Sequence, residues 1–151
     1  METTIDLETI EDATRRLGPV AYLATVTQAG DPHVSPVYPA FYESDIWVAV
    51  ALDFVKVRNV RAHPRVNLHY QVLEANDMET LLIWGIATVR TGLGIRRALW
   101  NGVFDYDLNS FSPGGPETAE EIGFLQIALN RAVMAGNMGS EPRRRWLKSA
   151  G

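Results

Sequence analysis

The chain has 151 residues, a formal net charge of −4 at pH 7 and no cysteine. This length fits a single domain, residues 1–151, and the acidic balance argues against a nucleic-acid binder, which needs a basic face. The absence of cysteine excludes disulfides and thiolate metal sites. No apolar run approaches the roughly 20 residues of a membrane span, and the acidic residues 1–12 lack an apolar signal core. We therefore expect a soluble cytoplasmic protein.

The N-terminal segment, residues 1–18, predicts a helix with one apolar face. Asp6 precedes the first apolar position and is the expected N-cap, because its carboxylate can accept a hydrogen bond from a free amide at the helix start. Gly18 and Pro19 follow the last apolar position and are expected to end the helix. The pattern indicates a packing helix without chemical function.

Two strands, residues 21–27 and 33–42, are expected to form a hairpin around a turn in which Gly30 adopts a positive φ. Pro36 and Pro39 fall inside the second strand and cannot donate to a sheet ladder, so this strand should be bulged or lie at a sheet edge. Its free backbone groups can either face a ligand or belong to an edge that proline protects from pairing. Both interpretations fit the residues.

The rest of the chain predicts more strands and two further helices. Buried or alternating strands are expected at residues 46–51, 66–72, 80–91 and 125–133, helices at residues 53–63 and 95–103, a loop at residues 105–116 and a C-terminal tail at residues 136–151. Gly85 lies in the middle of one strand and indicates a bulge or a close backbone approach. Six strands joined mainly by tight turns predict a small antiparallel barrel with helices outside.

The helix that follows Asp53 is the sharpest chemical feature. Free amides at a helix start favour an anion, and Lys56 in the first turn adds a positive charge that suits a phosphate. The alternative is a solvated basic helix face that includes Arg58 and Arg61. Because Asp53 is the expected N-cap, its carboxylate would compete with a phosphate for the same amides.

No arrangement of catalytic side chains is evident in the sequence. The histidines His33, His63 and His69 are too scattered for a metal site, and Asp105 with Asp107 is better explained as a solvated turn. No motif places a nucleophile beside a base. If the protein is an enzyme, we expect a cofactor to carry the reaction.

Four segments, taken in order, resemble the FMN-binding split barrel of pyridoxamine 5′-phosphate oxidase-like proteins. They are LATVTQAGDPHVSPVY at residues 23–38, IWVAVA at residues 46–51, KVRNVRAHPRVNLHY at residues 56–70 and IWGIATV at residues 83–89. The resemblance implies a mainly β fold, a six-stranded antiparallel Greek-key barrel with peripheral helices. It also implies an FMN-dependent oxidoreductase with a small-molecule substrate, and a homodimer with the cofactor at the subunit interface.

The resemblance further implies which residues hold FMN. They are Ser35, Pro36, Val37, Tyr38, Val50 and Ala51 along the flavin ring, and Val55, Lys56 and Val57 around the phosphate. Asn59 falls on the family's asparagine and is expected mainly to order the helix. Thr80 stands near the position of a glutamine that reaches the ring in the true oxidases.

Three departures from the family pattern bear on the activity. Phe54 and Val55 stand where family members often have serine or arginine, Thr80 is shorter than glutamine, and residues 141–151 offer no clear counterpart of the oxidases' basic substrate-binding residues. Oxidation of pyridoxamine phosphate is therefore not expected. The alternatives are a deazaflavin-dependent reductase of the same fold, a non-catalytic flavin or haem binder acting in stress response, or a structural dimer with an empty pocket.

Overall fold

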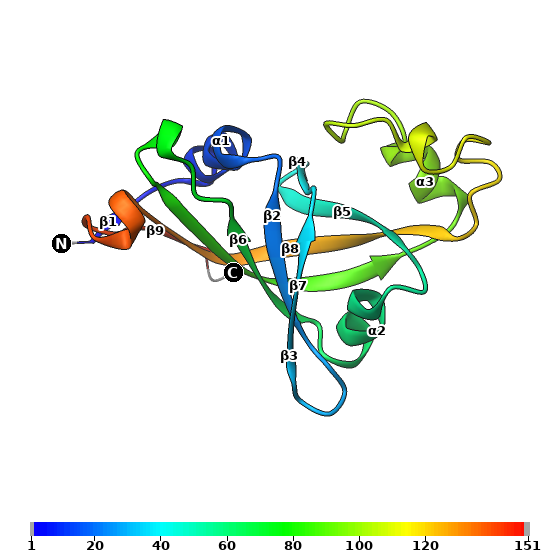
Figure 1. The fold of residues 1–151 in the computed structure, drawn as a ribbon, viewed down its shortest axis with the longest axis horizontal. Coiled ribbons are helices and arrows are strands. Elements are labelled where there is room, and N and C mark those ends of the chain that lie inside the picture. Colours follow the sequence, from blue (N-terminus) through cyan, green and yellow to red (C-terminus); the bar gives the residue numbers. More distant parts are fainter. Residues whose placement is uncertain (1, 150–151) are drawn as a thin grey trace.

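The computed structural model of the chain describes residues 2–149, whose strands join in one sheet (Figure 1). The helices are α1 (Leu7–Leu17), α2 (Val55–Ala62) and α3 (Leu93–Leu99), with short 3-10 turns η1 (Glu74–Asn76), η2 (Leu108–Ser110) and η3 (Asn137–Gly139). The strands are β1 (Thr3–Thr4), β2 (Ala21–Val26), β3 (Pro32–Val37), β4 (Ala40–Tyr42), β5 (Asp45–Ala51), β6 (Arg65–Tyr70), β7 (Thr80–Arg90), β8 (Ile122–Ala135) and β9 (Arg144–Leu147).

The six longer strands follow one another in the order β3-β2-β6-β7-β8-β5, and every neighbouring pair is antiparallel. Between β3 and β5 the described strands do not pair, so the barrel is split at this point. This confirms the predicted mainly β, split-barrel class. The edge position expected from Pro36 is also confirmed, because β3 pairs only with β2. The short strands β1 and β9 were not expected.

Local sequence explains how the N-terminal part folds. The Asp6 carboxylate accepts a hydrogen bond from the Thr9 amide at 2.9 Å, which confirms Asp6 as the N-cap of α1. The helix ends at Gly18, as predicted, and the Gly18 amide donates to the Thr14 carbonyl at 3.0 Å. In the hairpin that joins β2 to β3, Gly30 has a φ of 93°, the conformation that only glycine adopts without strain.

Gly85, in the middle of β7, lies at a β-bulge and also at a close approach of two backbones, the two features that its position predicted. The pairing of β7 with β8 shifts by one residue between Trp84 and Gly85, which is a β-bulge. A Cβ atom at Gly85 would lie 2.7 Å from the Ala128 carbonyl oxygen and equally close to a methyl group of Ile127. Only glycine therefore allows the two longest strands to approach this closely.

The structure corrects the start of α2. The Phe54 amide donates to the Ala51 carbonyl at 3.0 Å, so Leu52 and Asp53 lie within a tight turn and Phe54 becomes the N-cap. The prediction that Asp53 caps this helix is wrong, because the turn moves the helix start one residue along the chain. The Phe54 side chain makes no capping hydrogen bond.

The ends of α3, β6 and β8 differ by a few residues from the sequence prediction, and two other segments differ more. The strand expected at residues 33–42 is divided, since β3 ends at Val37 and the short β4 begins at Ala40. Within the expected tail, residues 136–149 include regular structure, because β9 pairs with the end of β8 and Trp146 packs against the core. Residues 150 and 151 lie outside the described part of the chain.

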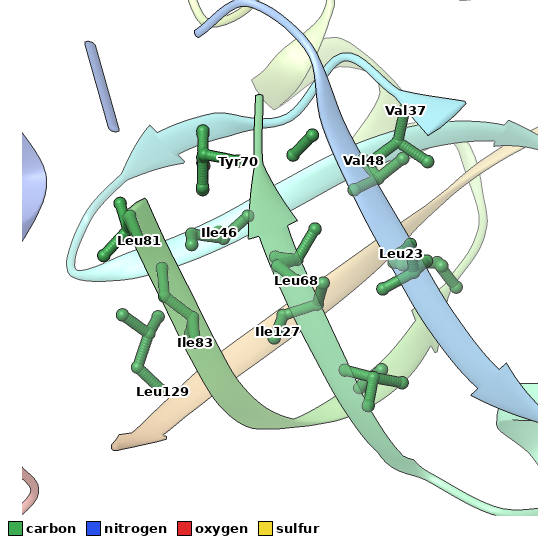
Figure 2. Packing of buried hydrophobic residues seen from close by; sticks show 14 of the residues in the cluster. Leu23, Val37, Ile46, Val48, Leu68, Tyr70, Leu81, Ile83, Ile127 and Leu129 are labelled. Carbon is green, nitrogen blue, oxygen red and sulfur yellow. The ribbon is translucent and has the colours of Figure 1, made fainter. Parts of the chain in front are cut away.

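Apolar side chains from both sides of the barrel fill its interior. Figure 2 shows side chains of β2, β5, β6, β7 and β8 meeting there, including Leu23, Ile46, Leu68, Ile83 and Ile127, each at most 1% exposed. A second, smaller cluster lies on the outer face of β5 and β8, beneath α3 and the loop that follows it. Its buried members are Trp47, Leu99, Trp100, Leu108, Ala119 and Phe124.

A buried carboxylate joins three elements at the end of the barrel near the N-terminus. Glu79, just before β7, accepts hydrogen bonds from Arg16 of α1 at 2.6 Å and from Arg144 of β9 at 2.8 Å. Burial opposes ionisation of Glu79, but the hydrogen bonds and charges of the two arginines outweigh it and lower its pKa. Glu79 therefore stays ionised and ties α1, β7 and β9 together.

We expect Glu79→Gln to lower the free energy of unfolding by about 1–3 kcal/mol at pH 7, because it leaves two arginines without their buried partner. The carboxylate stabilises the fold fully above its ordinary pKa of 4.5 and less as the pH falls through the lower folded-state pKa. Denaturant unfolding should thus show a gap between wild type and variant at pH 7 that narrows towards pH 3. Glu117→Gln, in the exposed pair with Arg97, should show little change. An equal gap at both pH values would contradict this account.

Candidate functional site

A pocket of about 350 Å³ opens at the end of β5. One wall consists of Val50 and Ala51 at the end of β5 and of Phe54 at the start of α2. The opposite wall is the loop between α3 and β8. The loop residues that line it are Trp100, Tyr106, Leu108, Phe111 and Glu121. The walls are mainly apolar and aromatic, which suits a planar ring system, and the volume lies in the range of small-molecule sites.

Aromatic side chains connect this loop to the split edge of the barrel. The Tyr106 ring lies 6.0 Å from the Tyr38 ring, just after β3, and 5.7 Å from the Phe111 ring, both edge to face. The structure therefore brings Tyr38 and the pair Val50 and Ala51, which were predicted to line a flavin ring, to the same region. Burial raises the pKa of Tyr106 to about 12, which disfavours the phenolate even more than in an ordinary tyrosine.

The start of α2, beside this pocket, has free backbone donors. The Val57 amide donates to the Phe54 carbonyl at 3.1 Å, whereas the preceding amides, those of Val55 and Lys56, have no intrahelical acceptor. Asp53 does not cap the helix, so its carboxylate does not occupy them. The two amides and the positive end of the helix dipole together favour an anion.

Lys56 adds a positive charge at the same place. Its ammonium nitrogen lies 5.1 Å from the centre of the Phe54 ring, and partial burial lowers its pKa by desolvation. Among the ion pairs formed by residues 2–149, none involves Lys56. A cation that is partly desolvated and not neutralised by a carboxylate favours an anionic ligand.

On β3, two polar atoms lack partners. The Oγ of Ser35 and the Nδ1 of His33 are buried and make no hydrogen bond. They lie on the face of β3 that also carries the buried Val37, whereas Pro36 and Tyr38 point outwards and are exposed. Buried polar atoms are rarely left unpaired, and a ligand is one of the explanations for such an exception.

The structure does not bring all the predicted site residues together. Thr80 begins β7 and its hydroxyl donates to the Ala135 carbonyl at 3.1 Å, whereas Val50 pairs with Gly123 at the opposite end of β8 (Figure 1). Thr80 is therefore far from the pocket of its own chain. Asn59 is buried and donates to the Thr25 hydroxyl at 3.0 Å, so it fastens α2 to β2 and faces the barrel.

Sequence reasoning missed the loop wall of the pocket. Residues 105–116 were predicted to be a loop, and no function was assigned to Tyr106, Leu108 or Phe111, whereas Trp100 was among the tryptophans considered able to stack on a planar ring. The available signal was the presence of large aromatic side chains inside a segment rich in turn-forming and acidic residues. Within residues 2–149, no group of three or more metal-ligating residues occurs, and no helix is long and apolar enough to cross a membrane.

If the pocket accepts an uncharged ring, Phe111→Ala should weaken the binding of N-phenyl-1-naphthylamine, a neutral aromatic fluorophore. Phe111 is 72% exposed, so its loss removes one wall without opening the core. We expect a loss of about 0.5–1.5 kcal/mol, as for one aromatic contact, measured by fluorescence titration. Leu147→Ala, an exposed apolar residue of β9, is the matched control. Equal affinities of wild type and Phe111→Ala would show that the fluorophore does not use this pocket.

The open six-stranded barrel, with α2 and an aromatic pocket near its split, defines a split-barrel protein. A sequence profile described as pyridoxamine 5′-phosphate oxidase matches residues 10–102, which is more than half of the chain. The chain belongs to the pyridoxamine 5′-phosphate oxidase family, as the resemblance of the four segments predicted. No curated protein sequence matches it.

Solved structures share the fold at low sequence identity. A pyridoxamine 5′-phosphate oxidase-related, FMN-binding protein from Nostoc punctiforme is 18% identical, with a TM-score of 0.72 over 95% of this chain and 90% of that one. A haem-binding protein from Mycobacterium smegmatis is 16% identical, with a TM-score of 0.68 over 95% and 58%. An F420 reductase is 19% identical, with a TM-score of 0.56 over 75% and 87%.

Proposed function

We propose that this protein binds FMN and acts as an FMN-dependent oxidoreductase on a small molecule. The observation that carries the proposal is that a ring pocket and an anion site meet at one residue. Phe54 lines the aromatic pocket and is also the N-cap of the helix that offers the free amides of Val55 and Lys56. A molecule with a planar ring at one end and a phosphate at the other matches this arrangement.

The residues present fit FMN at both ends. Val50, Ala51 and Phe54, facing the loop aromatics, would hold the ring, and Lys56 with the two free amides would hold the phosphate. The unpaired Ser35 hydroxyl lies on the strand predicted to border the ring, but Ser35 is not among the residues that line this pocket.

When bound, FMN accepts electrons and passes them on, and the protein binds and orients it. The loop aromatics exclude water from one side of the pocket, which strengthens the polar contacts inside it. The Tyr106 hydroxyl is protonated at neutral pH, as an ordinary tyrosine hydroxyl is, and can donate a hydrogen bond there. No side chain needs to act as a nucleophile.

We also propose a homodimer with the cofactor at the subunit interface. Thr80, where the family has a residue that reaches the ring, is far from the pocket of its own chain, so only a second copy can bring it there. Apolar side chains on the outer face of β2 and β3 support such a contact, since Tyr22 is 46% and Val34 is 62% exposed. An exposed apolar patch marks an interaction surface.

The two alternative cofactors, haem and a deazaflavin, would need different groups in the same pocket. A haem would need an iron ligand of the His, Cys, Met or Tyr type, and among the described lining residues only Tyr106 qualifies. Ligation by tyrosine uses the phenolate, which the raised pKa of Tyr106 disfavours. A deazaflavin would use the same ring wall and anion site as FMN. It therefore stays the second candidate, supported by the F420 reductase of the same fold.

We expect Lys56→Ala to weaken FMN binding by about 1–3 kcal/mol, as for a lost charge-assisted hydrogen bond, and to leave riboflavin binding nearly unchanged. Quenching of flavin fluorescence measures both affinities. Arg58→Ala, an exposed charge on the same helix, is the control. Equal FMN affinity in wild type and Lys56→Ala would place the phosphate elsewhere. A protein that is purified colourless and takes up no added FMN would overturn the proposal, and a parallel titration with a deazaflavin would decide for the second candidate.

The shared site can be tested by mixing subunits. In a dimer that combines Lys56 of one copy with Thr80 of the other, Lys56→Ala and Thr80→Trp should each impair both sites. A mixed dimer of the two variants retains one intact site, because one copy keeps Lys56 and the other keeps Thr80. We expect FMN binding to recover on mixing, to one site per mixed dimer. No recovery in a mixture shown to contain mixed dimers would contradict a site built from two copies.

A further inference from the structure

Phe54 is an unusual residue for the start of a helix. Serine, threonine, aspartate and asparagine are preferred there because their side chains accept hydrogen bonds from the first free amides. Phe54 takes the N-cap position with extended backbone angles, φ −64° and ψ 146°, and its side chain cannot accept such a bond. The aromatic cap therefore leaves the amides of Val55 and Lys56 available to a ligand.

The Phe54 ring also contacts the one cation of this helix start. The Lys56 ammonium lies 5.1 Å from the ring centre, within the range of a cation–π interaction. Lysine has a long, flexible side chain, and a contact to its charged end restricts where that end can lie. Phe54 is 45% exposed and lines the pocket, so it is in contact with the pocket and with Lys56 at once.

We propose that Phe54 is a positioning residue. Its ring holds the Lys56 ammonium beside the free amides while it forms one wall of the ring pocket, so that the anion end and the ring end of one ligand are kept in register. The inference rests on the proposed FMN function. It assigns a role to Phe54, which the comparison with the family pattern identified only as a departure from that pattern. It explains how a phosphate can be held without the serine or arginine that the family often places here.

A double-mutant cycle separates this role from that of a simple wall. If Phe54 acts through Lys56, Phe54→Leu should weaken FMN binding about two- to five-fold more than riboflavin binding, the range expected for a partly exposed cation–π contact. In the Lys56→Ala background this extra loss should vanish. Phe54→Tyr should restore FMN affinity, because it keeps the aromatic face. Equal losses for FMN in both backgrounds would overturn the proposal.

A second measurement does not depend on FMN. Inorganic pyrophosphate, titrated into the protein without cofactor, should shift the NMR signals of the Val55 and Lys56 amides, with affinity reduced by Phe54→Leu and restored by Phe54→Tyr. If FMN fails to bind while these effects appear, the proposed cofactor is wrong and the positioning role stands. If Phe54→Leu leaves the pyrophosphate affinity unchanged, the positioning role is wrong whatever the cofactor. Thermal unfolding midpoints close to wild type confirm that the variants are folded.

Discussion

The missing amide hydrogen of proline is the constraint on which the rest of this structure depends. Pro36 cannot donate to a neighbour, and the ladder of β3 ends at Val37, before Pro39. A strand of this kind can pair on one side only, so β3 becomes an edge and the barrel stays open between β3 and β5. A fully closed barrel would have no such opening for the loop between α3 and β8 to cover.

That loop depends on the opening for its position. Tyr106 reaches Tyr38 only because the chain leaves the ladder after β3, and Phe111 packs on Tyr106 from the outside. The loop is held at its base by Arg96, which is buried and donates to the Pro116 carbonyl at 2.8 Å, and by the Arg97–Glu117 pair. The pocket is therefore largely preformed, which reduces the entropy lost when a ligand binds.

Patterns that act over a few residues predicted much of the fold. The edge position of β3 was predicted from Pro36, the hairpin from Gly30 and the bulge from Gly85. Each of these features depends on backbone geometry at one position. The prediction that Asp53 caps α2 was wrong for a related reason. A preference for aspartate at an N-cap is statistical, and the turn closed by the Phe54 amide moved the helix start by one residue.

Features that depend on distant partners could not be predicted in this way. Nothing near Arg144 in the sequence indicates a strand, and β9 exists because the end of β8 offers it a free edge. The pocket wall is similar, since Tyr106 and Tyr38 are far apart in sequence and meet only in the fold. For this reason, the residues predicted to contact a flavin ring did not include the loop residues that line the pocket.

The division of the pocket between two parts of the chain bears on its chemistry. The family match ends at residue 102, so Val50, Ala51 and the start of α2 lie inside it, whereas Tyr106 and Phe111 lie outside it. The matched part provides the anion site and one wall, features that can serve any ligand with a phosphate. The loop provides the opposite wall and, if the pocket holds FMN as proposed, would lie beside the ring that a substrate approaches. Catalysis depends on what is held against the reacting face, so under the proposed function the loop would govern the choice of substrate and the matched part the choice of cofactor.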